Sequence, residues 1–235
     1  MTYVFQPAAP AAVPVHGGSS SFPVHRIYCV GRNYAEHAVE MGHTGREPPF
    51  FFLKPADTVL CVPEGEVGTM PYPSQTQNLH HEIELVVALG AGGRDIPVER
   101  AAELIWGYAI GLDMTRRDLQ NDMKKQGRPW SIGKGFEHSA PIGPIHAKSA
   151  TGELTQGAIT LDVNGQRRQT GDLKDLIWNV NETIATLSRA WTLAPGDLIF
   201  TGTPAGVGAV VPGDTLVGAV AGLGTLQLRI GPVSA

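Results

Sequence analysis

Residues 80–89 read HHEIELVVAL, and this stretch decides how the rest of the chain is interpreted. Its last eight residues contain six aliphatic side chains, which predicts a strand in the interior of a sheet. Alternate side chains of a strand point to the same face, so Glu82 and Glu84 share one face while Ile83 and Leu85 take the other. Two neighbouring carboxylates raise each other's pKa unless a cation lies between them. The pair therefore either lies on a solvated edge strand or binds a cation.

A third carboxylate follows the next apolar stretch. Residues 106–114 read WGYAIGLDM, and Asp113 closes the strand that they predict. A single aspartate at a strand end is often a turn former. Three carboxylates at two neighbouring strand ends instead form a site of hard oxygen ligands, which suits Mg²⁺ or Mn²⁺. A zinc site is less favoured, because the sequence contains neither an HExxH nor a CxxC spacing.

Around these two strands the chain predicts many short strands and few helices. The expected strands are residues 26–31, 82–89, 106–114 and 159–163, and the expected helices are 33–41, 98–104 and 182–191, with a helix or turn at 116–125. Asn164-Gly165 predicts a hairpin turn, and both Pro195-Gly196-Asp197 and Pro212-Gly213-Asp214 predict type II turns. We expect a mixed, mostly β domain over residues 24–235, after an arm at residues 1–23 that is flexible or leads into an edge strand.

The composition excludes several classes of protein. The chain has 235 residues and a formal charge of −4, with 18 Lys and Arg residues against 22 Asp and Glu residues. Without a basic face it is not expected to bind nucleic acid. No apolar run approaches the roughly 20 residues that span a bilayer. The first 15 residues lack the basic start and apolar stretch of a signal peptide, and the two cysteines are too few for a disulfide framework. We therefore expect a cytoplasmic protein that does not bind a membrane.

Two further features carry possible chemistry. His37 and Glu40 lie three residues apart on the predicted helix 33–41, and hence on one face of it. A carboxylate beside an imidazole raises its basicity, as in a general base for water, although an ordinary surface pair has the same spacing. Lys134 lies between two glycines in an apolar run, which indicates either partial burial against an anion or a simple loop lysine.

A glycine-rich stretch, FTGTPAGVG at residues 200–208, follows another apolar run. Its hydroxyl groups and main-chain amides could bind a carboxylate, and a plain turn would have the same composition. No GxGxxG leads from a strand into a helix, and no GxSxG is present. The sequence therefore supports neither dinucleotide binding nor serine hydrolase chemistry.

Taken together and in this order, these stretches resemble the fumarylacetoacetate hydrolase family over roughly residues 26–230. The matching stretches are VGRNY at 30–34 with His37, Glu40 and Met41, FLKP at 52–55, NLHHEIE at 78–84, GY at 107–108, LDMT at 112–115, RD at 117–118 with Gln120, GK at 133–134 with Phe136, PGD at 195–197, TGTP at 201–204 and GVG at 206–208. The shared order makes the resemblance far more specific than any single motif.

The resemblance implies an α+β, mostly β fold, the mixed β-roll of the family's C-terminal domain. It implies that residues 24–235 form a single catalytic domain and that the protein is usually a homodimer. It also implies a bound Mg²⁺ or Mn²⁺, held by three carboxylates: Glu82, Glu84 and Asp113.

Roles for other residues are implied in the same way. His37 and Glu40 would form the catalytic dyad that activates water, and Lys134 would help to hold the oxyanion or carboxylate of the substrate. Contacts with the substrate are implied for four residues: Arg117, Gln120, Lys134 and Thr203.

The expected activity is the metal-dependent hydrolysis of a C–C bond in an acylpyruvate, which is a small 2,4-dioxo acid. Fumarylpyruvate, cleaved to fumarate and pyruvate in gentisate degradation, is the expected substrate. The alternatives are an oxaloacetate decarboxylase or a diacid isomerase or decarboxylase on the same scaffold. A metal-binding or ligand-binding protein without turnover is a further alternative.

Overall fold

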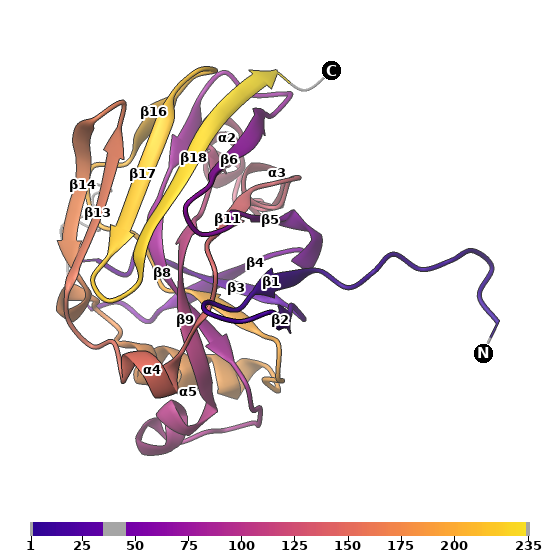
Figure 1. Cartoon of the computed structure of the whole chain (residues 1–235), viewed down its shortest axis with the longest axis vertical. Coiled ribbons are helices and arrows are strands. Elements are labelled where there is room, and N and C mark those ends of the chain that lie inside the picture. The colour runs from indigo at the N-terminus through magenta and orange to yellow at the C-terminus, as the bar shows by residue number, and fades with distance from the viewer. Residues whose placement is uncertain (1, 35–45, 234–235) are drawn as a thin grey trace.

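The computed structural model describes residues 2–34 and 46–233, and in these residues the fold is mostly β (Figure 1). An eight-stranded sheet has the order β4 (Phe50–Lys54), β3 (Ile27–Gly31), β15 (Leu198–Phe200), β8 (Ile83–Leu89), β9 (Ile105–Leu112), β11 (Ala140–Ile142) and β5 (Val59–Cys61), and β12 (His146–Ala147) also pairs with β9. A five-stranded sheet has the order β14 (Gln166–Asp172), β13 (Ala158–Val163), β17 (Thr215–Val220), β18 (Gly224–Val233) and β6 (Val67–Tyr72).

Two smaller sheets complete the strands. One has the order β10 (Thr115–Arg116), β7 (Leu79–His81) and β16 (Gly208–Val210), and the other pairs β1 (Ala12–Pro14) with β2 (Ser21–Pro23). The helices are α2 (Arg117–Lys125), α3 (Ser131–Lys134), α4 (Lys148–Thr151) and α5 (Val180–Ala190), with 3-10 helices η1 (Ala56–Thr58), η2 (Val98–Leu104) and η3 (Leu173–Asp175). No helix in the described ranges has the length and apolar character needed to cross a bilayer.

The β8 strand lies between β15 and β9 in the interior of the eight-stranded sheet and is buried along its whole length. Its Ile83, Leu85 and Val87 belong to a core cluster that also contains residues of the five-stranded sheet, such as Leu161 and Leu228. The opposite face of β8 carries Val86 and Ala88, which pack in a second cluster. Burial on both faces explains why the sequence of β8 is almost continuously apolar instead of alternating.

The N-terminal residues are partly built into this second cluster. The hairpin of β1 and β2 buries Val13 and Phe22 there, beside Ile27 of β3. The residues before β1 extend away from the sheets (Figure 1). The division of the chain into an arm at residues 1–23 and a domain at residues 24–235 stays a prediction.

The predicted turns are confirmed by their backbone geometry. Asn164 and Gly165 have φ of 51° and 75° and join β13 to β14 in a two-residue hairpin. Gly196 has a φ of 93°, and the N–H of Asp197 donates to Ala194 O at 3.1 Å, as a type II turn requires. Gly213 has a φ of 98° and closes a turn of the same kind.

Most predicted elements agree with the structure to within two residues at each end. The helix predicted at residues 182–191 is α5, whose N-terminus is closed by a capping box between Asn179 and Glu182. The segment 98–104 is the 3-10 helix η2. The helix predicted at residues 33–41 lies, from residue 35 onward, outside the described residues.

Candidate active site

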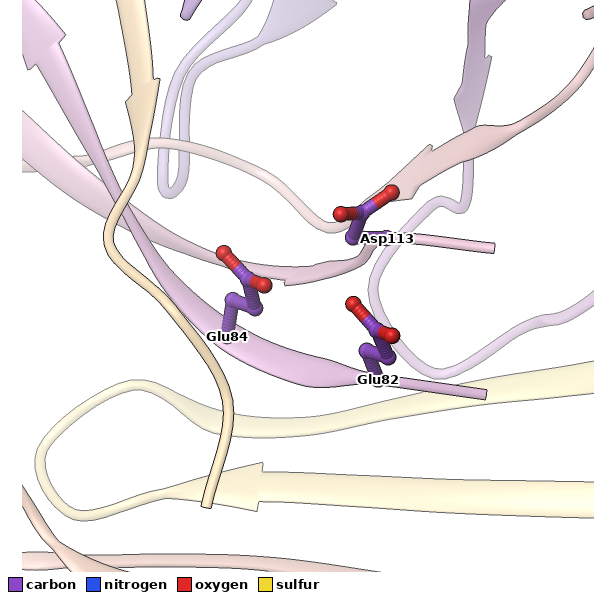
Figure 2. A group of neighbouring side chains, drawn as sticks. All are labelled: Glu82, Glu84 and Asp113. Atoms are coloured by element: carbon purple, nitrogen blue, oxygen red, sulfur yellow. The ribbon is translucent and has the colours of Figure 1, made fainter. Parts of the chain in front are cut away.

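Three carboxylates meet where the β8–β9 pair ends. Glu82 precedes β8, Glu84 lies in β8, and Asp113 follows β9 directly. Because Ile83 pairs with Leu112 in antiparallel register, Glu82 and Asp113 become neighbours, and the N–H of Asp113 donates to Glu82 O at 2.8 Å. One ligand atom from each carboxylate lies within 4.8 Å of those of the other two (Figure 2). All three side chains are buried, so neither a solvated edge strand nor an exposed turn describes them.

Buried cations surround two of these carboxylates. Lys134 Nζ lies 2.8 Å from Glu82 Oε2 and 2.6 Å from Asp113 Oδ2. Lys54 Nζ lies 2.9 Å from Asp113 Oδ1, and Arg117 Nη2 donates to Glu82 Oε1. Burial alone would lower the pKa of Lys134, but the charges of Asp113 and Glu82 outweigh it and raise that pKa. Lys134 is therefore a buried, charged ammonium and not a simple loop lysine.

Glu84 has a different environment. Its Oε2 accepts a hydrogen bond of 2.8 Å from the N–H of Gly202, and no Lys, Arg or His of the described ranges forms an ion pair with it. Burial, followed by the charges of Asp113 and Glu82, raises the pKa of Glu84 well above its usual value.

This charge pattern fits a divalent cation. The carboxylate oxygens are the hard ligands that Mg²⁺ and Mn²⁺ prefer. An ion held by Glu82, Glu84 and Asp113 would also supply the positive charge that Glu84 lacks in the described part of the chain. The residues present therefore fit the metal that the sequence predicts.

The carboxylates form one wall of an open pocket. The residues that line it are Val30, Gly31, Arg32, Phe50, Phe52, Glu82, Glu84, Asp113, Arg117, Gln120, Trp130, Lys134 and Thr203. Every predicted site residue that the structure describes is in this set. Arg117 Nη1 donates to Gln120 Oε1 at 2.5 Å, one turn further along α2, which joins these two predicted substrate contacts. His37 and Glu40 lie outside the described residues.

The loop after β15 is fixed against β8 by hydroxyl groups. Thr201 Oγ1 donates to Leu85 O at 2.9 Å, and Thr203 Oγ1 donates to Ile83 O at 2.7 Å. The Nε2 of Gln169 in turn donates to Thr203 Oγ1 at 2.8 Å. The hydroxyl hydrogen of Thr203 is thus already donated, and the contact of Thr203 with a substrate carboxylate stays a prediction.

Sequence reasoning did not identify Gln169, Lys54 or the role of His81. Gln169 is buried in β14, and its Oε1 accepts from the N–H of Ile83 at 3.1 Å and lies 2.9 Å from His81 Nδ1. Burial, and then the charge of Arg117, lowers the pKa of the neighbouring His80 to about 4. His80 is therefore neutral beside the carboxylates at pH 7. Gln169 lies on an otherwise polar strand far along the chain, so no local pattern indicates it.

Comparison with known proteins places this site in a family. The model of the fumarylacetoacetate (FAA) hydrolase C-terminal domain matches residues 26–231. The chain belongs to the fumarylacetoacetate hydrolase family. The expected fold class is thereby confirmed, and the chain is an enzyme of that family instead of a binding protein without turnover.

Relatives within the family carry several kinds of name. A fumarylpyruvate hydrolase of Ralstonia sp. is 48% identical over 187 residues, which cover 79% of this chain and 94% of that protein. An oxaloacetate tautomerase of Escherichia coli K12 is 41% identical over 201 residues, which cover 85% of this chain and 90% of that protein. A crystal structure of fumarylpyruvate hydrolase from Pseudomonas aeruginosa with Mn²⁺ and pyruvate has 56% identity and a TM-score of 0.97, and covers 98% of this chain and 100% of that one.

Proposed function

We propose that this protein is a Mg²⁺- or Mn²⁺-dependent acylpyruvate hydrolase that cleaves fumarylpyruvate to fumarate and pyruvate. The observation that carries the proposal is the cluster of Glu82, Glu84 and Asp113 in the wall of a pocket that also contains Lys134 and Arg117. The similar structure from Pseudomonas aeruginosa, which holds Mn²⁺ and pyruvate, supports both the metal and the product. A homodimer, a cytoplasmic location and a place in gentisate degradation belong to the same proposal.

Glu82, Glu84 and Asp113 would hold the metal ion. When bound, Mg²⁺ or Mn²⁺ acts as a Lewis acid that polarises the carbonyl group of a 2-oxo acid. Lys134 presents a fixed ammonium at the same wall and would stabilise the negative charge that develops on the enolate oxygen of the leaving pyruvate. Arg117 and Gln120 are held together by their hydrogen bond and would orient the substrate in the pocket.

The hydrolytic step needs a base for water, and we propose His37 with Glu40 for it. The imidazole would take a proton from water, and the resulting hydroxide would add to the C4 carbonyl carbon of the substrate. The bond between C3 and C4 then breaks, its electron pair goes to C3 of the pyruvate enolate, and the proton returns to C3. Arg32, which lines the pocket, precedes His37 by five residues in the sequence.

Oxaloacetate is the second candidate substrate, because relatives at 39–41% identity are named oxaloacetate tautomerases. Decarboxylation or tautomerisation of oxaloacetate would use the same carboxylates and Lys134 to stabilise an enolate. Neither reaction consumes water, so neither requires a water-activating dyad. The two candidates therefore differ at His37 and Glu40 and agree at the metal site.

The test is a coupled assay for pyruvate release from fumarylpyruvate and, separately, from oxaloacetate. Each reaction is run with EDTA, with Mg²⁺ and with Mn²⁺, and enol–keto conversion of oxaloacetate is followed by ultraviolet absorbance. We expect fast, metal-dependent pyruvate release from fumarylpyruvate and loss of that activity in EDTA. If the enzyme turned over oxaloacetate and not fumarylpyruvate, the hydrolase proposal would be wrong, although the proposed metal site would stand.

His37→Ala tests the proposed role in water activation. We expect kcat for fumarylpyruvate hydrolysis to fall by about 100-fold, in the range that a general base contributes. Any oxaloacetate turnover is expected to fall much less, because that reaction needs no activated water. Steady-state kinetics with both substrates and saturating Mn²⁺ measure the two losses. Equal losses on both substrates would remove His37 from the water-activating role.

A further inference from the structure

Arg32 lines the pocket, and the proposed reaction assigns no role to it. No ion pair or hydrogen bond joins its side chain to another residue of the described ranges. Its Cζ lies 5.4 Å from the centre of the Phe50 ring, and its Nε is buried without a hydrogen-bond partner. A buried donor without an acceptor costs free energy, which an acceptor on a ligand would recover.

The main chain holds Arg32 in this position. Its φ of 56° lies in the left-handed region, which costs a residue other than glycine roughly 1–3 kcal/mol. The next side chain, Asn33, donates to Trp178 O at 2.9 Å and to Thr201 O at 2.8 Å, and accepts from the N–H of Trp178 at 2.8 Å. These bonds attach the turn to the loop whose main chain binds Glu84. Arg32 therefore has a fixed position relative to the candidate metal ligands.

An aromatic platform lies beneath the Arg32 guanidinium. Gly31 pairs with Phe50 across β3 and β4, and a Cβ atom on Gly31 would lie 2.0 Å from Cζ of Phe50. Only glycine therefore allows the Phe50 ring to lie against β3. Trp130 supports this ring in an edge-on contact with 5.4 Å between centroids. A guanidinium over a ring keeps its N–H edges free, and those edges match a carboxylate bidentately.

The charges of the pocket favour a ligand with two carboxylates. Arg117 and Lys134 form ion pairs with the carboxylate cluster. Arg32 also lines the pocket, but it forms no ion pair within the described ranges. Among the described residues the lining contains three carboxylates and three cations, and a divalent ion would make this part of the lining doubly positive. Lys54, which is buried and paired with Asp113, adds to this excess of positive charge. A dianion balances such a pocket better than a monoanion does.

Building on the proposed function, we infer that Arg32 binds the second carboxylate of the substrate and determines specificity. The enzyme then selects 2-oxo acids that carry a carboxylate at the far end over those that end in an uncharged group. Fumarylpyruvate has such a carboxylate, whereas an acylpyruvate with a simple alkyl group lacks it. The 2-oxo acid end faces the carboxylate cluster, and Arg32 receives the other end.

The test uses two probes that cannot be hydrolysed, 2-oxoheptanedioate and 2-oxoheptanoate. Both have the carbon chain length of fumarylpyruvate and lack its 4-oxo group, and they differ only in the terminal carboxylate. Isothermal titration calorimetry of the Mn²⁺-loaded protein gives the ratio of their dissociation constants. We expect the wild type to prefer the diacid by about 10- to 100-fold, as a charged hydrogen-bonded contact provides. Arg32→Met is expected to bring this ratio close to one, and Arg32→Lys to restore part of it.

Two further variants control the result. Arg32→Gly removes the side chain and suits the positive φ, so it is expected to fold and to lose the preference as Arg32→Met does. Arg128→Met removes an exposed arginine from the adjoining groove and is expected to keep the preference. Absence of a preference in the wild type, or its survival in both Arg32→Met and Arg32→Gly, would overturn the inference. Because neither probe is cleaved, these outcomes are independent of whether fumarylpyruvate is turned over.

Discussion

Replacing Glu84 by glutamine is expected to stabilise the metal-free protein and to abolish its metal-dependent activity. In the metal-free state the Glu84 carboxylate is buried beside Asp113 and Glu82, and within the described residues it accepts a hydrogen bond only from the N–H of Gly202. A glutamine of the same shape keeps the Gly202 hydrogen bond and can donate its amide hydrogens to the neighbouring carboxylates. With metal present, the loss of one ligand is expected to lower kcat/KM by about 1000-fold or more.

The stabilisation has a defined pH dependence. The folded state raises the pKa of Glu84 above its usual value of 4.5, so ionisation opposes folding increasingly as pH rises above that value. Each unit of pH between the unfolded and folded pKa values costs about 1.4 kcal/mol. At neutral pH the variant should therefore be more stable than the wild type, and each kcal/mol gained raises Tm by roughly 2–4 °C in a chain of this size. The gain should disappear as pH falls to the unfolded pKa.

Differential scanning calorimetry in EDTA measures this gain, from pH 7.5 down to the acid limit of folding. Titration with Mn²⁺ then measures the metal affinity and the rise in Tm that binding gives. Glu103→Gln is the matched control, because Glu103 is exposed and pairs only with Arg100 in the described chain. A Glu84→Gln protein that is less stable than the wild type in EDTA, or one that binds Mn²⁺ as tightly, would contradict the assignment.

The cluster of candidate metal ligands could be predicted from the sequence because the placement of the three carboxylates follows from strand periodicity. Alternation in β8 puts Glu82 and Glu84 on one face, and the antiparallel pairing with β9 brings Asp113 beside them. These relations depend only on residues within two consecutive strands. The sequence also indicated that Lys134 is partly buried against an anion, since solvation poorly explains a lysine between glycines in an apolar run.

Other parts of the site depend on contacts that no local pattern records. Lys54 lies at the end of β4, and its partner Asp113 is far along the chain. Gln169 is the one buried side chain on a polar stretch of β14, and only the packing of that strand against the loop after β15 reveals it. The position of Arg32 depends on a positive φ and on the hydrogen bonds of Asn33, neither of which periodicity predicts. Periodicity describes single strands, whereas these residues connect segments that are far apart in the chain.

Asp113→Asn is expected to cause the largest loss of stability at the site. Its carboxylate is bound by Lys54 and Lys134, and all three side chains are at most 3% exposed. Lys134 keeps Glu82 as a partner after the change, whereas the partners that Lys54 keeps within the described residues are the carbonyl oxygens of Met114 and Lys134. A buried ammonium without its carboxylate costs about 3–5 kcal/mol. We therefore expect the fold to be weakened as well as the metal site lost.

The double variant Asp113→Asn/Lys54→Met separates the two effects. Removing the ammonium together with its carboxylate is expected to recover at least about 2 kcal/mol of the lost stability, because no buried charge is then left without a partner. Urea unfolding of the wild type, both single variants and the double variant gives this coupling energy. Asp162→Asn is the control, since the pair of Asp162 with Arg167 is exposed and should be worth less than about 1 kcal/mol.

Recovery of stability is not expected to restore Mn²⁺ binding, because the double variant still lacks one of the proposed ligands. Comparing the recovery of stability with the recovery of Mn²⁺ binding therefore distinguishes the two roles of Asp113. Its Oδ1 and Oδ2 atoms compensate Lys54 and Lys134 in the metal-free fold, and the same carboxylate belongs to the candidate metal site. Additive losses in the two single variants would show that Lys54 and Asp113 do not stabilise each other. In that case the carboxylate would serve the metal site alone, and Lys54 would be held by the two carbonyl oxygens.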